Sequence, residues 1–133
     1  MKRAMRLCVV FNPTARGNKA KRFRRRLEAL ARECVLMPTT GPGAAVDLAA
    51  EAVRQGFDTV VAAGGDGTVN EVLNGIAGFE HGLDRARLGI LPLGTMNVFA
   101  RELGLPLNPD AAWSLARGGN ETTIDLPWAE FEV

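Results

Sequence analysis

The sequence contains few cysteines, little net charge and no long apolar run. Cys8 and Cys34 are its only cysteines, and neither belongs to a CxxC pair. We interpret both as small buried residues of a reduced protein, although the sequence leaves a disulfide between them open. The formal net charge is +1, which argues against a nucleic-acid binder driven by bulk charge. No run of about 18 apolar residues is present, so no segment is expected to span a membrane.

Targeting signals and the commonest nucleotide motif are also lacking. The first residues, MKRAMRLCVVFNP, include an apolar run that is too short for the core of a signal peptide. We therefore predict a cytoplasmic protein, with peripheral contact at the inner membrane surface left open. No GxxxxGK[ST] pattern occurs, which excludes a P-loop NTPase. His81 is the only histidine and has no second ligand residue nearby, so we expect it to be exposed.

The residues that are present suit one compact α/β domain. The chain has 133 residues, of which 47% are hydrophobic, enough to build a core. Apolar runs predict strands over 6–11, 34–37, 58–63 and 88–91, with a last strand beginning at 122–126, and helical patterns lie over 18–33, 44–55, 68–77, 96–103 and 109–117. Such repetition with uniformly apolar strands predicts a parallel sheet sandwiched by helices.

A glycine turn after the third predicted strand is the most informative motif. The sequence Gly64-Gly65-Asp66-Gly67-Thr68 stands between that strand and a helix. Glycines let the backbone approach a phosphate oxygen closely, and the first N–H groups of the helix favour negative charge. The other strands end near Asn12, Thr39 and Gly94. Since the carboxyl ends of parallel strands meet at one edge, where such sheets bind ligands, the sequence predicts a nucleotide-phosphate site there.

Three stretches together carry a resemblance to a known family. They are FNPTARGNKA at 11–20, AAGGDGTVNEVLNG at 62–75 and LGILPLGTMNVFAREL at 88–103. The chain resembles the N-terminal, nucleotide-binding domain of the diacylglycerol kinase catalytic-domain family, which includes bacterial soluble lipid kinases, diacylglycerol kinases, ceramide kinases and sphingosine kinases. The resemblance implies a Rossmann-like fold similar to phosphofructokinases and NAD kinases. It implies an ATP-binding domain over 1–121, and 122–133 as the start of a second, β-rich domain.

The resemblance also implies a set of site residues. Those expected to contact the nucleotide are Asn12, Thr39, Gly64, Gly65, Asp66, Gly67, Thr68, Asn70, Glu71, Gly94, Thr95 and Asn97. Asp66 is the one catalytic assignment, for phosphate or metal organisation, and the catalytic base is expected outside this chain. Glu71 is expected to stabilise the first loop and Asn97 to brace the second. No residue is assigned as a direct metal ligand.

ATP and Mg²⁺ are the implied cofactors, and a lipid hydroxyl is the implied acceptor of the γ-phosphate. Diacylglycerol, phosphatidylglycerol, a sphingoid base, ceramide and an undecaprenol-type lipid all stay open. The chain alone is expected to have little or no activity. Peripheral contact with a membrane and self-association through an apolar face are consistent with this interpretation, whereas nucleic-acid binding is not.

Two departures from the family pattern leave alternatives open. Val98 follows Asn97 where many members have aspartate, and Arg16 stands where glycine is common. Val98 makes a non-catalytic nucleotide module conceivable. An NAD kinase-like enzyme of small metabolites is the other alternative, because NAD kinases share a GGDGT loop of this kind. The glycine turn also has a purely structural explanation, as a tight turn that packs a helix on a strand.

A basic cluster in the first predicted helix has two interpretations. Its members are Lys19, Lys21, Arg22, Arg24, Arg25 and Arg26. A solvated helix face is favoured over a contact with an anionic membrane, because the arginines are spread around the helix. Trp113 is predicted to pack in the core or against another domain.

Overall fold

A four-stranded parallel sheet forms the centre of the protein. The computed structural model describes residues 5–118. The strands are β1 (Leu7–Phe11), β2 (Val35–Pro38), β3 (Thr59–Gly64) and β4 (Arg87–Pro92). They lie in the order β2-β1-β3-β4, and every neighbouring pair is parallel. The predicted α/β fold with a parallel sheet between helices is confirmed.

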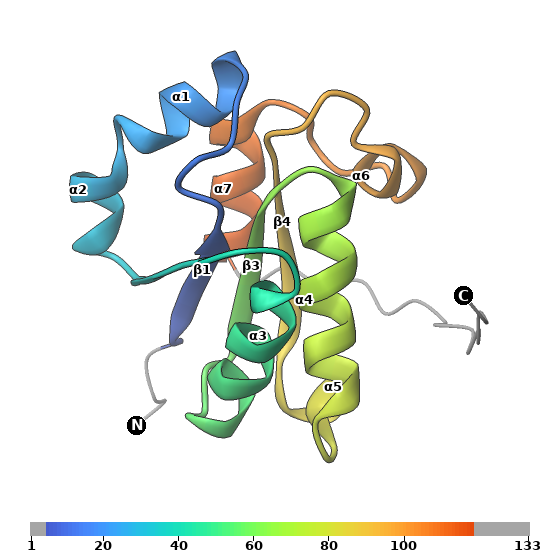
Figure 1. Cartoon of the computed structure of the whole chain (residues 1–133). Helices are drawn as coiled ribbons and strands as arrows, with labels where there is room; N and C mark the ends of the chain where they lie inside the picture. The colour runs from blue at the N-terminus through green and yellow to red at the C-terminus, as the bar shows by residue number, and fades with distance from the viewer. Residues whose placement is uncertain (1–4, 119–133) are drawn as a thin grey trace.

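Helices cover both faces of this sheet (Figure 1). They are α1 (Asn18–Arg24), α2 (Leu27–Ala31), α3 (Ala44–Arg54), α4 (Asp66–Gly78), α5 (Gly82–Arg85), α6 (Val98–Glu102) and α7 (Pro109–Gly118). One hydrophobic cluster joins α3 and α4 to one face, and a second joins α1, α2 and α7 to the other. None of the helices within residues 5–118 is long and apolar enough to cross a membrane.

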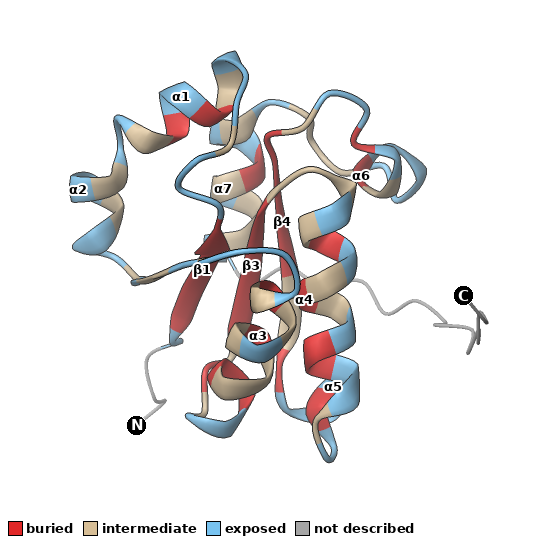
Figure 2. Ribbon diagram, viewed as in Figure 1, coloured by how far each residue is buried: buried red, intermediate tan, exposed pale blue. Residues whose placement is uncertain are grey.

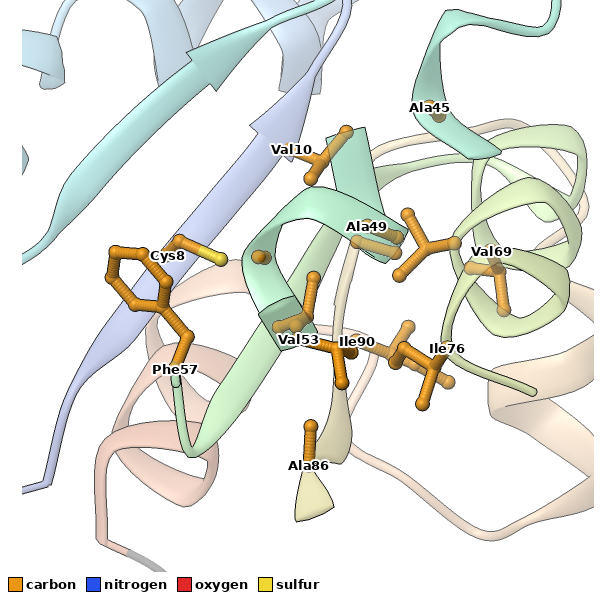
Figure 3. Close-up of a cluster of buried hydrophobic side chains, with 14 of the residues drawn as sticks. Cys8, Val10, Ala45, Ala49, Val53, Phe57, Val69, Ile76, Ala86 and Ile90 are labelled. Carbon is orange, nitrogen blue, oxygen red and sulfur yellow. The ribbon is translucent and has the colours of Figure 1, made fainter. Parts of the chain in front are cut away.

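The central strands β1 and β3 are buried on both sides, as their uniformly apolar sequences require, whereas the edge strand β2 is partly exposed. Along β1, Cys8 and Val10 join the cluster under α3 and α4, whereas Val9 and Phe11 join the cluster under α1 and α7. This alternation follows the two-residue period of a strand. Figure 2 shows the central strands as the most buried part of the molecule, and Figure 3 shows the first cluster in detail.

Apart from end shifts such as that of the helix predicted over 96–103, which spans Val98–Glu102, the elements differ from the predictions in three places. The helix predicted over 18–33 is divided into α1 and α2, with a turn at Arg25 and Arg26. No glycine or proline lies there, so tertiary contacts account for the break: Arg24 donates to the carbonyl of Ala15, and Arg26 pairs with Asp110. Ala31, the last residue of α2, is exposed.

The other two differences concern α4 and the segment that follows it. Helix α4 begins at Asp66, two residues before the predicted start, so it includes most of the glycine motif. A short helix, α5, lies in a segment predicted to be loop. His81 precedes α5 with a left-handed backbone (φ 56°) and is exposed, as predicted.

Both cysteines are free thiols. Cys8 is fully buried in β1, as predicted, whereas Cys34 is only half-buried just before β2. Burial is the main cause that raises the pKa of Cys8 to about 12 and that of Cys34 to about 11. The predicted strand at 122–126 and the predicted domain boundary at 121 lie outside the described residues.

Candidate functional site

At the carboxyl edge of the sheet, the connections after two neighbouring strands run in opposite directions. After β1 the chain moves outward to β2, and α3 then returns it to β3 on the other side of β1. The loops that follow β1 and β3 therefore leave neighbouring strands in opposite directions. Open α/β sheets bind their ligands at such a switch point. The predicted site residues lie in the four segments that follow β1, β2, β3 and β4, and each of these segments begins at this edge (Figure 1).

The loop after β3 leads directly into the N-terminus of α4. Gly65 is the N-cap residue, and α4 runs for 13 residues. The first four N–H groups of a helix have no partner within it, and the helix dipole favours an anion there. Gly64 has a packing reason to be glycine, because a Cβ atom on it would lie 2.6 Å from Oγ1 of Thr68.

A second glycine loop, after β4, touches the first. The N–H of Leu93 donates to the carbonyl of Gly64 at 3.0 Å. A Cβ atom on Gly94 would lie 2.6 Å from Cα of Gly65, so the two backbones meet glycine to glycine. We call residues 64–68 and 94–97 the joined glycine loops. Their contact explains why position 94 is glycine, since a side chain there would force the loops apart, whereas a Cβ atom on Gly65 would lie 3.3 Å from Cα of Gly94 and would fit only tightly.

Gly67 differs from these glycines. It is exposed, and a Cβ atom on it would meet nothing within 4 Å. Its φ is not positive, and it lies in the first turn of α4, where glycine is about 1 kcal/mol less favourable than alanine. Neither packing nor backbone conformation therefore explains this glycine. A ligand that approaches the backbone closely would explain it.

Asn97 closes the second loop on itself. Its Nδ2 donates to the carbonyl of Gly94 at 2.8 Å, and its Oδ1 accepts from the N–H of Gly94 at 3.1 Å. Asn97 is 4% exposed and has a left-handed backbone (φ 49°), a conformation that asparagine tolerates better than most residues. The geometry is that of a brace, whereas a contact between Asn97 and a nucleotide stays a prediction.

Asp66 ties the two loops together. Its Oδ2 accepts from the N–H of Val98 and its Oδ1 from the N–H of Phe99, each at 3.0 Å. These hydrogen bonds cap α6, and they hold the pKa of Asp66 below its usual value, the bond from Phe99 being the larger cause. Both carboxylate oxygens are thus engaged within the protein. The observed role of Asp66 is to hold the second loop, and phosphate or metal organisation stays a prediction.

The described residues do not form a magnesium site. Within residues 5–118 no group of three His, Cys, Asp or Glu side chains could hold a metal ion. The carboxylate of Asp66 is occupied by two N–H groups, and Val98 supplies no oxygen from its side chain. This part of the chain offers N–H donors that suit phosphate oxygens, but it does not offer a set of protein ligands for Mg²⁺.

The loops after β1 and β2 are held by different contacts. Oδ1 of Asn12 accepts from the N–H and the hydroxyl of Thr14, at 2.9 and 2.8 Å, which is a local turn at the strand end. The N–H of Thr39 donates to the carbonyl of Phe11 at 2.8 Å and so extends the pairing of β2 with β1. Both residues lie at the predicted edge.

Glu71 connects α4 to the loop after β2. Its Oε1 accepts from the N–H of Gly43 at 2.6 Å. This contact holds the segment before α3, and the expected stabilisation of the glycine loop by Glu71 stays a prediction. Gly43, which has a positive φ (83°), was not among the predicted site residues. The signal for it was the GPG sequence at 41–43, typical of a tight turn. Asn70 and Thr95 are exposed.

Comparison with known families agrees with this arrangement. The model of the diacylglycerol kinase catalytic domain matches residues 6–129. The chain belongs to this family. A diacylglycerol kinase of Bacillus subtilis is 41% identical to it over 110 residues, which cover 80% of this chain and 34% of the relative. A diacylglycerol kinase of Staphylococcus saprophyticus is 38% identical over 122 residues, covering 89% of this chain and 39% of the relative.

Solved structures of the diacylglycerol kinase catalytic-domain family share the fold. A crystal structure of a diacylglycerol kinase from Bacillus anthracis superposes with a TM-score of 0.70 at 32% identity. The superposition covers 88% of this chain and 43% of that one. This chain therefore spans well under half the length of the relatives that it matches.

Proposed function

We propose that this chain is the nucleotide-binding part of a lipid kinase and that ATP phosphates bind at the joined glycine loops. The observation that carries the proposal is the uncovered backbone at Gly67, in the first turn of α4 and beside the contact between Gly65 and Gly94. Membership of the diacylglycerol kinase catalytic-domain family supports it.

The residues of the joined glycine loops have separate tasks in this proposal. The N–H groups of the first turn of α4 donate to phosphate oxygens, and the missing side chain of Gly67 lets a phosphate approach them. Asp66 fixes the second loop through the N–H groups of Val98 and Phe99. Asn97 keeps that loop closed around Gly94. Phosphoryl transfer depends mainly on such positioning and on charge stabilisation.

The proposed acceptor is the hydroxyl group of a lipid. The relatives from Bacillus subtilis and Staphylococcus saprophyticus are both named diacylglycerol kinases. Diacylglycerol is therefore the first lipid to test. Because the chain spans only about two fifths of the Staphylococcus relative, we propose that residues of the whole protein beyond the joined glycine loops select the lipid and supply the base.

The proposal is tested with the product of the whole gene. It is incubated with ATP labelled at the γ-phosphate, Mg²⁺ and a panel of lipids that includes diacylglycerol, a sphingoid base and ceramide. The 133-residue chain is the parallel control. Label in one lipid with the gene product, and none with the control, is the expected result. Label in a soluble metabolite instead of a lipid would contradict the proposed acceptor.

A non-catalytic nucleotide module is the second candidate function. The specific observation in its favour is that residues 5–118 contain no group of metal-binding side chains and that Val98 replaces a carboxylate common in the family. In that case ATP would bind to the gene product with no label transferred to any acceptor. Binding and transfer are therefore measured on the same preparation.

A further inference from the structure

A cavity lies on the opposite face of the sheet from α3 and α4. It has a volume of about 410 Å³ and lies between α1, α2 and the beginning of α7. No residue of the joined glycine loops lines it. Its volume is near the lower end of the range for small-molecule sites, about 300–1,000 Å³. We call it the α1–α7 cavity.

The floor of the α1–α7 cavity is apolar. Phe23 and Leu91, which are 6% and 4% exposed, line it together with the half-buried ring of Trp113. All three belong to the hydrophobic cluster under α1 and α7. The indole N–H of Trp113 donates to Oε2 of Glu33 at 3.3 Å, which fixes the ring. An alkyl chain placed on this floor would be removed from water.

The wall formed by α1 is cationic. Lys19 and Arg22 of α1 line the cavity together with Arg26, which lies in the turn after α1. Their spacing of three residues puts Lys19 and Arg22 on one side of α1. Asp110, the one carboxylate among the lining residues in the described part of the chain, pairs with Arg26. Two positive charges, on Lys19 and Arg22, exceed the acidic charge of the lining. Half of the basic cluster is thus gathered on one wall, although its sequence pattern suggested a spread around the helix.

We propose that the α1–α7 cavity binds a single-chain anionic lipid. The alkyl chain lies on the floor formed by Phe23, Leu91 and Trp113, and the acidic head group lies between Lys19 and Arg22. The combination of an apolar floor with an excess of positive charge on one wall fits this amphiphile better than a free anion or a neutral lipid. The modest volume favours one alkyl chain over two. This site is separate from the joined glycine loops and does not depend on the proposed function.

The test titrates the 133-residue chain, carrying Trp128→Phe, with dodecyl phosphate in a calorimeter and a fluorimeter. The sequence has two tryptophans, Trp113 and Trp128, so this change leaves Trp113 as the only indole reporter. Saturable binding with a change in the emission of Trp113 is expected. Hexyl phosphate should bind more weakly, and dodecanol and inorganic phosphate should bind more weakly still. A dodecyl phosphate isotherm without any change in Trp113 emission would put the ligand elsewhere and overturn the proposal.

Two double variants distinguish binding in the cavity from a general attraction of anions to the basic segment. Lys19→Ala with Arg22→Ala should weaken dodecyl phosphate binding by about tenfold or more, because two charge-assisted contacts are lost. Lys21→Ala with Arg25→Ala removes the same charge from the same segment but not from the cavity, and it should leave the affinity within about twofold.

Two outcomes of these experiments contradict the proposal. Equal weakening by both double variants would mean that the segment attracts anions without a built site. The second outcome combines two results: both double variants weaken binding to phosphatidylglycerol vesicles equally, and dodecyl phosphate gives no saturable response. The basic residues would then contact a membrane surface instead of a lipid in the cavity.

Discussion

At the scale of single residues, the glycines of the joined glycine loops have two different explanations. Gly64 and Gly94 are required by packing, because a Cβ atom on either would lie 2.6 Å from a neighbouring atom. Gly67 has open space around it. The structural explanation of the motif, a tight turn between strand and helix, therefore accounts for part of it but not for Gly67, which the proposed phosphate site would explain.

Replacing Gly67 by alanine should separate folding from binding. Gly67→Ala should leave the free energy of unfolding unchanged or raise it by about 0.5–1 kcal/mol, since alanine is the better helix residue. Affinity for ATP should fall, because the new methyl group lies where a phosphate is proposed to approach. Urea unfolding and calorimetric titration measure the two effects.

The matched control for Gly67→Ala is Gly78→Ala. Gly78 lies at the other end of the same helix, and a Cβ atom on it would likewise meet nothing within 4 Å. Its replacement should leave ATP affinity unchanged. Equal ATP affinity of the wild-type chain and Gly67→Ala would remove the main support for the phosphate site.

The carboxylate of Asp66 should stabilise the fold in a way that depends on pH. Asp66→Ala should destabilise the fold by about 1–2 kcal/mol, as expected for the loss of a capping carboxylate. The pKa of Asp66 is lowered in the folded protein, so its stabilising effect is complete at neutral pH. It is lost as the pH falls below the ordinary range of aspartate and through the lowered pKa.

Urea unfolding of wild type and Asp66→Ala at several pH values measures this difference. The two midpoints should converge in acid. Asp47→Ala is the control, because Asp47 is exposed in the first turn of α3. If the difference in urea midpoint between wild type and Asp66→Ala stays constant from neutral to acidic pH, the charged carboxylate does not hold the second loop.

The two thiols should react slowly in the folded protein. Burial raises the pKa of Cys8 to about 12 and that of Cys34 to about 11, and only the thiolate is a good nucleophile. Near neutral pH a disulfide reagent should label neither cysteine quickly unless urea is added. Rapid labelling of Cys8 without denaturant would contradict its burial in β1.

At the scale of elements, α3 and α4 pack unusually closely through a glycine. A Cβ atom on Gly75 would lie 2.3 Å from the carbonyl oxygen of Val46 and 2.7 Å from Cβ of Ala49. Gly75→Ala should therefore push the helices apart and cost about 1–3 kcal/mol in the free energy of unfolding. Gly78→Ala, three residues later, should not. An unchanged urea midpoint for Gly75→Ala would contradict this close contact.

Element boundaries could be predicted where local sequence decides them. Gly56 and Gly104 have positive φ and follow α3 and α6 closely, which is where glycine commonly ends a helix. The turn between α1 and α2 could not be predicted, because the RFRRRLEAL segment contains no helix breaker. The turn is held by contacts outside that segment, of Arg24 with Ala15 nine residues away and of Arg26 with Asp110 84 residues away.

At the scale of the whole molecule, the parallel sheet could be predicted from the sequence, and so could the edge at which the strand-end residues gather. Apolar strands alternating with helices dictate that layout, and the strand-end residues then meet at one edge. Three other features depend on how segments distant in the sequence pack. They are the contact of Gly65 with Gly94, the capping of α6 by Asp66 and the α1–α7 cavity. Patterns within one segment carry no information about such contacts.

The most direct test of the nucleotide site is an amide NMR titration of the isotope-labelled chain with ADP. The account predicts one saturable set of shifts that includes Gly65, Gly67 and Thr68 in the first loop and Gly94 and Asn97 in the second. Because the two loops touch, both sets should follow a single binding curve. No saturable shift in either loop, or shifts confined to the α1–α7 cavity, would contradict the claim that the joined glycine loops hold a nucleotide.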